Sequence, residues 1–328
     1  MESREMEKIL ITGAAGFIGA RIAEMLQSTD IQVIGIDNFN EYYDSRLKRY
    51  RVAQISKSAH IIIFDVDITD EEKMENIFRE HTFSAVIHLA GMAGIRHSLD
   101  HPLEFERTNV GGTAVLLDLM HRYHVPRLVF ASSSSVYGEN IPPFIEEMKT
   151  DTPTSIYAAT KKSAETLIHS YHKLFGINCV ILRYFSVYGP QGRPDMSYFR
   201  FIREIDEHRP IRIYGDGTQK REFTFIDDIA RGTISALHVE GCHICNLGGG
   251  RAYSIKNLVA LIETGLSKKA ITIFEKTDIS DLPTTFADIS KARELIQWTP
   301  SIHFEDGIAA TIKWHLENCD FIRSLRYD

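Results

Sequence analysis

KILITGAAGFIG, residues 8–19, is the stretch of sequence that decides how this chain folds. Its apolar start predicts a short buried strand, and the amphipathic pattern that continues to Leu26 predicts a helix. Glycines between a strand and a helix let the backbone turn tightly and approach a pyrophosphate at the helix N-terminus. The spacing, Gly13-x-x-Gly16-x-x-Gly19, departs from the common G-x-G-x-x-G, but the strand before and the helix after are the context that such a motif requires.

The next apolar run, at 31–36, predicts a second strand that ends in Asp37. An acid about 20 residues beyond the glycines hydrogen-bonds the adenosine ribose and repels a 2′-phosphate, which favours NAD over NADP. An acid in this place can also simply cap a helix or a turn. Further strands are predicted at 61–68, 85–91, 128–131 and 178–184, with helices between them. Alternating strands and helices predict an α/β fold with a doubly wound parallel sheet of Rossmann type.

The pattern changes after residue 185, where turns, short strands and helices follow one another less regularly. We therefore expect residues 1–185 to form the dinucleotide-binding domain. Residues 186–328 should form mainly a smaller substrate domain. The apolar run at 244–250 predicts a strand that returns to the main sheet, so a strand and a helix near 242–266 are assigned to the first domain. The second domain is therefore predicted to be discontinuous.

Tyr157 and Lys161 lie four residues apart in a predicted helix, so their side chains can point into one site. An ammonium close to a phenol lowers the tyrosine pKa, and such a tyrosine can exchange protons with a substrate hydroxyl. Just upstream, the strand at 128–131 runs into the serines 132–135, and open α/β sheets place their chemistry beyond strand ends. The same Tyr–Lys spacing is common on solvated helix faces, so the pair indicates a catalytic site only together with the other motifs of the chain.

Composition narrows the classes of partner. The net charge of −7 disfavours nucleic acid, because a phosphate backbone requires an excess of Lys and Arg. No apolar run approaches the roughly 20 residues that span a bilayer, and the first residues lack the apolar segment of a signal peptide, so we expect a cytoplasmic protein without membrane contact. Cys242 and Cys245 lie three apart in a predicted strand and so face opposite sides; without a second Cys pair we expect packed thiols and no metal.

Taken together, these motifs resemble those of the extended short-chain dehydrogenase/reductases, and among them the sugar-nucleotide epimerases. The matches in chain order are Gly13-x-x-Gly16-x-x-Gly19, Asp37-Asn38, Asp67-Ile68, His88-Leu89-Ala90, Asn109, residues 132–138, Tyr157-x-x-x-Lys161, Arg183-Tyr184-Phe185, and Arg221 before Ile226-Asp227-Asp228. Residues 37–44, 131–138, 155–162 and 187–196 resemble more closely the UDP-glucuronate 4-epimerases.

The resemblance implies NAD as cofactor and a UDP-sugar as substrate, with the sugar C4 oxidised transiently to a ketone. Catalysis is then expected from Ser133, Tyr157 and Lys161. The implied cofactor contacts are Gly13, Gly16, Phe17, Ile18, Gly19, Asp37, Asn38, Asp67, Ile68, Leu89, Ala90, Asn109, Ser132, Tyr157, Lys161 and Tyr184. The implied substrate contacts are Ser133, Ser134, Ser135, Ser186, Arg193, Arg221 and Asp281. The family usually dimerises, which implies a homodimer through the helices predicted at 109–124 and 158–175.

The serines distinguish this chain from related enzymes. Related decarboxylases carry Glu, and related 4,6-dehydratases Asp-Glu, where this chain has Ser134 and Ser135. Neutral hydroxyls can bind a uronate carboxylate without repelling it, and Ser186 would help, although the serines could instead only cap the strand end. His97 stands where the resembling epimerases have Tyr, Gly91 and Met92 replace Ala and Gln, Ser186 stands in place of Thr, and Asp278 lies in the segment expected to contact UDP.

Three functions remain open at this point. The first is a UDP-glucuronate 4-epimerase. The second is a related enzyme, either a 4-epimerase of UDP-glucose or a UDP-N-acetylhexosamine, or a UDP-glucuronate decarboxylase. The third is a protein without catalytic activity that binds NAD as a scaffold; the presence of Ser133, Tyr157 and Lys161 argues against it, since binding alone requires none of the three.

Overall fold

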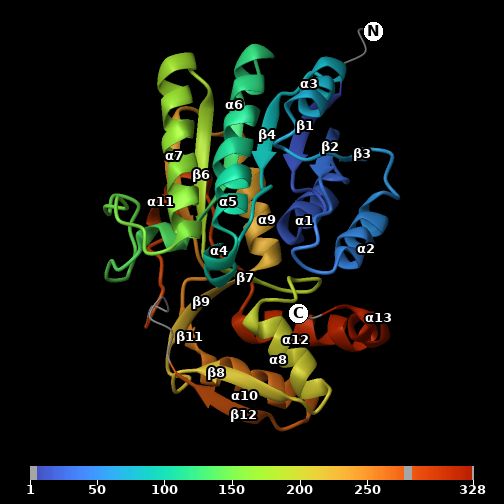
Figure 1. Ribbon diagram of the computed structural model, residues 1–328, viewed down its shortest axis with the longest axis vertical. Coiled ribbons are helices and arrows are strands. Elements are labelled where there is room, and N and C mark those ends of the chain that lie inside the picture. Colours follow the sequence, from blue (N-terminus) through green and yellow to red (C-terminus); the bar gives the residue numbers. More distant parts are fainter. Residues whose placement is uncertain (1–5, 277–282, 327–328) are drawn as a thin grey trace.

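The large lobe is built on a seven-stranded sheet, seen in the upper part of Figure 1 of the computed structural model, which describes residues 6–276 and 283–326. The strand order is β10-β6-β5-β4-β1-β2-β3, and every neighbouring pair is parallel. The strands are β1 (Glu7–Thr12), β2 (Ile31–Asp37), β3 (Ile61–Asp65), β4 (Ala85–His88), β5 (Arg127–Ser133), β6 (Asn178–Tyr184) and β10 (Cys242–Leu247). The predicted α/β class with a doubly wound parallel sheet is confirmed.

Helices cover both faces of this sheet because successive strand residues point to opposite sides. Ile9 packs into one core cluster with α1, α9 and α11, whereas Leu10 packs into the other with α3, α6 and α7. The helical segments of this lobe are α1 (Phe17–Leu26), α2 (Ser45–Ile55), α3 (Glu71–Glu80), α4 (Ile95–Asp100), α5 (Pro102–Glu106), the π-helical turn η1 (Arg107–Gly111), α6 (Gly112–Arg122), η2 (Ser134–Tyr137), α7 (Ile156–Phe175), α9 (Ile226–Ser235), η3 (Ala236–His238) and α11 (Ser290–Ile296). None of the described helices is both long and apolar enough to span a membrane.

A smaller lobe lies below the carboxyl ends of the main strands (Figure 1). It contains a three-stranded sheet of order β11-β9-β7 and a two-stranded sheet of β12 and β8. Its elements are β7 (Ser186–Tyr188), α8 (Ser197–Asp206), β8 (Pro210–Tyr214), β9 (Lys220–Phe225), β11 (Ala252–Ser254), α10 (Ile255–Leu266), β12 (Ile271–Glu275), α12 (Phe304–Glu317) and α13 (Cys319–Ser324). A third core cluster, which includes Ile202, Leu258 and Ile308, holds these elements together.

The chain passes between the lobes more often than a single boundary at residue 185 would require. β10 returns to the main sheet and pairs with β6 along its whole length, as its apolar sequence predicts. The helix near 242–266 differs from the prediction: α10 buries Leu258 and Ile262 in the core of the small lobe, against α8 and α12. The helix that returns to the large lobe is α9, which packs against α1.

Candidate active site

A cavity of about 430 Å³ lies between the lobes, at the carboxyl edge of the main sheet. Parallel strands end at the same edge, so residues that follow β1, β2, β3, β4, β5 and β6 converge there. Most residues predicted for the site line this cavity: Gly13, Gly16, Phe17, Ile18, Gly19, Asp37, Asn38, Ile68, Leu89, Ala90, Ser132, Ser133, Ser134, Ser135, Tyr157, Lys161, Tyr184, Ser186 and Arg193. Motifs that are separate in the sequence thus line one cavity.

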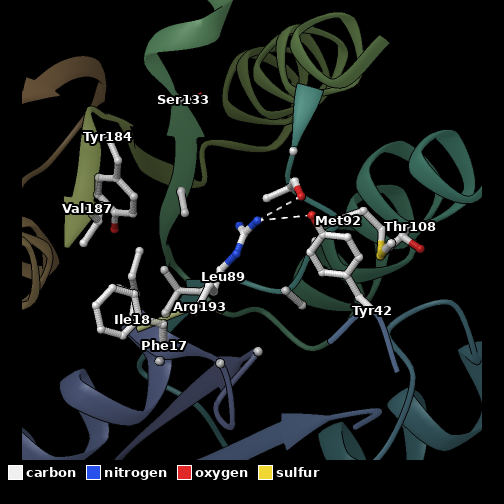
Figure 2. Close-up of a pocket in the computed structure, with 18 of the residues that line it drawn as sticks. Phe17, Ile18, Tyr42, Leu89, Met92, Thr108, Ser133, Tyr184, Val187 and Arg193 are labelled. Carbon is white, nitrogen blue, oxygen red and sulfur yellow. Dashed lines mark hydrogen bonds between the residues drawn. The ribbon is translucent and has the colours of Figure 1, made fainter. Parts of the chain in front are cut away.

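The glycine turn lines the cavity together with Phe17 and Ile18, which are labelled in Figure 2. Gly13 has a φ of +71°, and a Cβ placed there would lie 2.8 Å from the amide nitrogen of Ala90. A Cβ on Gly19 would lie 2.2 Å from the carbonyl oxygen of Gly13, so side chains are excluded at both positions. α1 begins at Phe17 without a hydrogen bond from a capping side chain in the described structure, which leaves its first amide groups available to an anion.

Asp37 ends β2 at the rim of the cavity, with only 6% of its surface exposed. Its carboxylate accepts hydrogen bonds from the amide of Ala15 at 3.2 Å and from that of Phe39 at 2.9 Å. Lys48 of α2 adds a third donor at 3.2 Å, and its ammonium also lines the cavity. The glycine turn and α2 therefore fix the direction of this carboxylate. Lys48 was not predicted from the sequence, because nothing local marks it among the other cations of α2.

Tyr157 and Lys161 both reach the cavity from the first turns of α7, as their spacing predicts. The predicted effect of the ammonium on the phenol is wrong for the chain by itself. Burial raises the pKa of Tyr157, against a hydrogen bond from Ser133 and the positive charge of Arg193. Lys161 instead donates to the carbonyl oxygen of Ala131 at 2.8 Å, and burial lowers its own pKa to about 8. Without a ligand, the tyrosine is therefore held as the neutral phenol.

The four serines at the end of β5 and the start of η2 have different roles. Ser132 lines the cavity, but its hydroxyl donates at 2.6 Å to the buried Glu165, which also pairs with Arg183 at 2.9 Å. Ser133 caps η2 by accepting from the amide of Ser135 at 3.2 Å, and its hydroxyl also meets Tyr157.

Ser134, Ser135 and Ser186 line the cavity and are partly exposed. Among the residues that the structure describes, the only carboxylates on the cavity wall are Asp37 and Asp195. The three serines therefore contribute polar hydroxyl groups to the wall and no negative charge.

Arg193 projects into the middle of the cavity, between Tyr184 and Tyr42 (Figure 2). It pairs with Asp195 through two hydrogen bonds, of 3.0 Å and 2.5 Å, and donates to the phenol of Tyr42 at 3.3 Å and to the carbonyl oxygen of Ala93 at 3.2 Å. Tyr42 in turn donates to Asp195 at 3.3 Å. Tyr42 and Asp195 were not predicted as site residues. Asp195 lies only two residues from Arg193, whereas Tyr42 reaches both through contacts that span roughly half the chain, which no local pattern predicts.

Three predicted contacts stand outside the cavity wall of the described residues. Asn109 is buried in η1, where it brackets both backbone groups of Met92, at 2.7 and 3.0 Å, and donates to Thr160 at 2.9 Å. It therefore shapes the wall from behind. Asp67 follows β3 and accepts from Asn38 at 2.8 Å, and Arg221 lies on β9 in the small lobe. Asp281, like Asp278, lies outside the described residues.

Comparison with known proteins agrees with this arrangement. A family model described as the NAD dependent epimerase/dehydratase family matches residues 9–248. A UDP-glucuronate 4-epimerase of Thermodesulfobacterium geofontis is 48% identical over 97% of this chain and 98% of its own length. The crystal structure of UDP-glucuronic acid 4-epimerase from Bacillus cereus, in complex with UDP-glucuronic acid and NAD, has a TM-score of 0.89 and 36% identity, covering 94% of this chain and 99% of its own.

A more distant structure, the UDP-glucose 4-epimerase of Thermotoga maritima with UDP-glucose, has a TM-score of 0.87 at 28% identity and covers 95% of this chain and 99% of its own. The fold, the glycine turn and the Tyr–Lys pair are thus accompanied by similarity along nearly the whole chain. This chain belongs to the NAD dependent epimerase/dehydratase family.

Proposed function

We propose that this protein interconverts UDP-glucuronate and UDP-galacturonate by epimerisation at C4 of the sugar, with NAD as its cofactor. The observation that carries the proposal is one cavity wall on which Ser133, Tyr157 and Lys161 stand beside the uncharged serines 134, 135 and 186. The 48% identity to a UDP-glucuronate 4-epimerase over nearly the full length of both chains supports the same reaction.

The cavity offers suitable contacts for two parts of NAD, the pyrophosphate and the adenosine ribose. The turn around Gly13 and Gly19 has no room for a Cβ, so a pyrophosphate can approach its backbone, and α1 offers free amide groups beside it. Asp37 presents a fixed carboxylate for the adenosine ribose, where a 2′-phosphate would meet negative charge. When bound, NAD would accept the C4 hydride, return it to the opposite face, and add positive charge beside Tyr157.

The protein's own groups then move the proton of the O4 hydroxyl. Tyr157 must lose its phenolic proton before it can accept the substrate's, and burial opposes that loss. Positive charge next to the ring is therefore a requirement of the mechanism, because it favours the phenolate. Ser133 meets the Tyr157 phenol and lines the cavity, so it can bridge phenol and substrate hydroxyl. Lys161 is held by Ala131 at 2.8 Å, so its charge stays at a fixed point on the wall.

The substrate carboxylate explains why the serines matter. Oxidation at C4 of a uronate gives a β-keto acid, which loses carbon dioxide readily. Ser134, Ser135 and Ser186 can each donate a hydroxyl proton to that carboxylate and bring no opposing charge. Arg193 adds a positive charge to the same cavity, although in the protein without ligand its guanidinium forms an ion pair with Asp195. Fixing the carboxylate in this way suppresses decarboxylation and selects uronates over neutral sugars.

The test is a panel of UDP-sugars given to purified protein, with the products separated and identified. We expect UDP-galacturonate from UDP-glucuronate, with kcat/KM at least about 10² higher than for UDP-glucose, because a site built on hydrogen bonds penalises an analogue that leaves them unmade. Ser186→Ala should reduce this preference, whereas Ser163→Ala, on the exposed side of α7, should leave it unchanged. Equal values for the two sugars would favour an epimerase of neutral hexoses, and release of carbon dioxide would favour a decarboxylase.

The cofactor is tested separately. Protein purified without added nucleotide is denatured, and the released nucleotide is identified by chromatography. The carboxylate of Asp37 predicts NAD(H). Mostly NADP(H) would contradict the assignment, whatever the sugar specificity.

We also propose that the protein is a homodimer that pairs through α6 and α7. Leu174 and Phe175, near the end of α7, are 72% and 45% exposed, and Phe175 stacks on His121 of α6 at 3.9 Å. Apolar side chains on a helix surface are typical of subunit contacts. Light scattering after gel filtration should give twice the mass of one chain. Leu174→Asp should lower that mass, and a wild-type monomer would contradict the proposal.

A further inference from the structure

A cluster of three metal-binding side chains lies beside the cavity, on α4 and α5. His97, His101 and Glu104 (the histidine cluster) have ligand atoms that all lie within 4.8 Å of one another. Ligands of a tetrahedral zinc ion at their usual bond lengths are about 3.3 Å apart. Small side-chain rotations would therefore bring two imidazole nitrogens and one carboxylate oxygen onto a single ion.

The local backbone holds these side chains together. His97 and His101 are four residues apart, the spacing that places two side chains on one face of a helix. α4 ends at Asp100, His101 stands at the junction, and Pro102 opens α5 as its first residue. Glu104 follows within the first turn of α5, with its carboxylate 3.9 Å from Nδ1 of His101. All three ligands thus come from eight consecutive residues with two helical turns between them.

The donor set indicates the class of ion. Two imidazoles and one carboxylate suit zinc and its neighbours nickel, cobalt and copper, whereas magnesium and calcium prefer oxygen alone. The side chains of His101 and Glu104 are 45% and 63% exposed, so an ion can reach them from solvent and keep water in its remaining position. The rings of His97 and His101 are already stacked, with centroids 4.2 Å apart.

His97 connects the cluster to the catalytic cavity on two sides. Its ring lies 4.5 Å from that of Tyr42, whose phenol contacts both Arg193 and Asp195. On the other side its ring centroid lies 5.9 Å from that of Phe105, which packs edge-on against Tyr157. A rotation of His97 toward an ion must therefore be accommodated by groups that line the cavity.

We propose that the histidine cluster binds one divalent transition-metal ion of the zinc class per chain, and that its occupancy lowers turnover by holding His97 and, through Tyr42, Arg193. The ion takes no part in the chemistry. Ion binding stands independently of the proposed function, whereas the effect on turnover rests on it.

Binding is tested by calorimetric titration of Zn²⁺ into tag-free protein that has been stripped of metal with a chelator and retains its nucleotide. We expect one saturable site per chain. His101→Ala and Glu104→Gln should each weaken binding at least about tenfold, because even partners outside the coordination shell are worth that much. His124→Asn is the matched control: His124 is exposed and has a φ of +56°, which Asn tolerates. Equal binding by all variants, or none by the wild type, would overturn the proposal.

The effect on turnover is measured with UDP-glucuronate, with and without saturating Zn²⁺. Zinc should slow the wild type and His124→Asn, but not His101→Ala or Glu104→Gln, whose metal-free rates should equal that of the wild type. His97→Tyr keeps an aromatic ring between Tyr42 and Phe105. This variant should bind no zinc, and its turnover should not fall when zinc is added. Inhibition of every variant alike, or binding without inhibition, would refute the coupling. Absence of any product without metal would count against the proposed function and leave the binding result intact.

Discussion

Glu222 gives the sharpest test of the energetics of the small lobe. It lies on β9 with none of its surface exposed, and its carboxylate accepts from the amides of Gly250 at 2.8 Å and Ala287 at 2.7 Å. Burial outweighs these two donors and raises the pKa of Glu222 from 4.5 to about 7. The folded protein therefore holds this proton more tightly than the unfolded chain does.

The sign and size of the effect follow from that difference. A raised pKa means that the stabilisation is complete below pH 4.5 and is lost as the pH rises toward 7. At 1.36 kcal/mol for each pKa unit, the loss between about pH 5 and pH 8 is about 2–3 kcal/mol. Glu222→Gln keeps the shape of the side chain but cannot ionise. The free energy of unfolding of this variant, relative to the wild type, should therefore rise by that amount over the same interval.

The assay is urea denaturation at both pH values, followed by circular dichroism and by fluorescence, whose transitions must coincide for the free energies to be comparable. Glu240→Gln, at an exposed position after η3, controls for the loss of one acidic side chain. It should keep the dependence of the wild type. If Glu222→Gln and the wild type lose stability in parallel as the pH rises, the buried carboxyl is not the source and the reasoning fails.

Three further changes have defined outcomes. Tyr157→Phe should reduce kcat for UDP-glucuronate by about 10²–10⁴ and leave the bound NAD per chain unchanged; near-normal turnover would exclude Tyr157 as the base. Gly19→Ala puts a Cβ 2.2 Å from the Gly13 carbonyl oxygen, so the nucleotide released on denaturation should fall well below that of the wild type. Arg183→Met strands the buried Glu165 carboxylate and should cost about 3–5 kcal/mol in urea denaturation, with Glu165→Leu added to it restoring part; a loss near zero would contradict the ion pair's role.

Features encoded over short distances along the chain were predictable from the sequence. The glycine turn, the acid after β2 and the Tyr157–Lys161 spacing are local, and the parallel sheet brings them to one edge by its topology alone. Asn109 shows the limit of a motif: it was predicted to contact the cofactor, but its amide hydrogen-bonds the backbone of Met92 and it is not on the cavity wall of the described residues. A polar residue in a pattern does not reveal which way it points.

Other features depend on contacts between distant segments. Tyr42 meets Arg193 and Asp195 only because the loop before α2 and the segment after β7 come together in space. The raised pKa of Tyr157 is likewise a property of burial, which spacing on a helix does not encode. α10 belongs to the small lobe because its apolar face packs against α8 and α12. The sequence of α10 predicts that the helix has an apolar face but not which elements cover it.

The late return of β10 to the main sheet constrains how the protein can fold while it is being synthesised. The strand beside β6 is supplied by residues 242–247, after the chain has already passed through β7, α8, β8 and β9. A ribosome therefore releases much of the small lobe before the sheet of the large lobe can close. Until then β6 is an open edge, whose unpaired backbone groups can recruit another chain. The two lobes must mature together, and a fragment that ends at residue 185 should aggregate more readily than one that extends past 247.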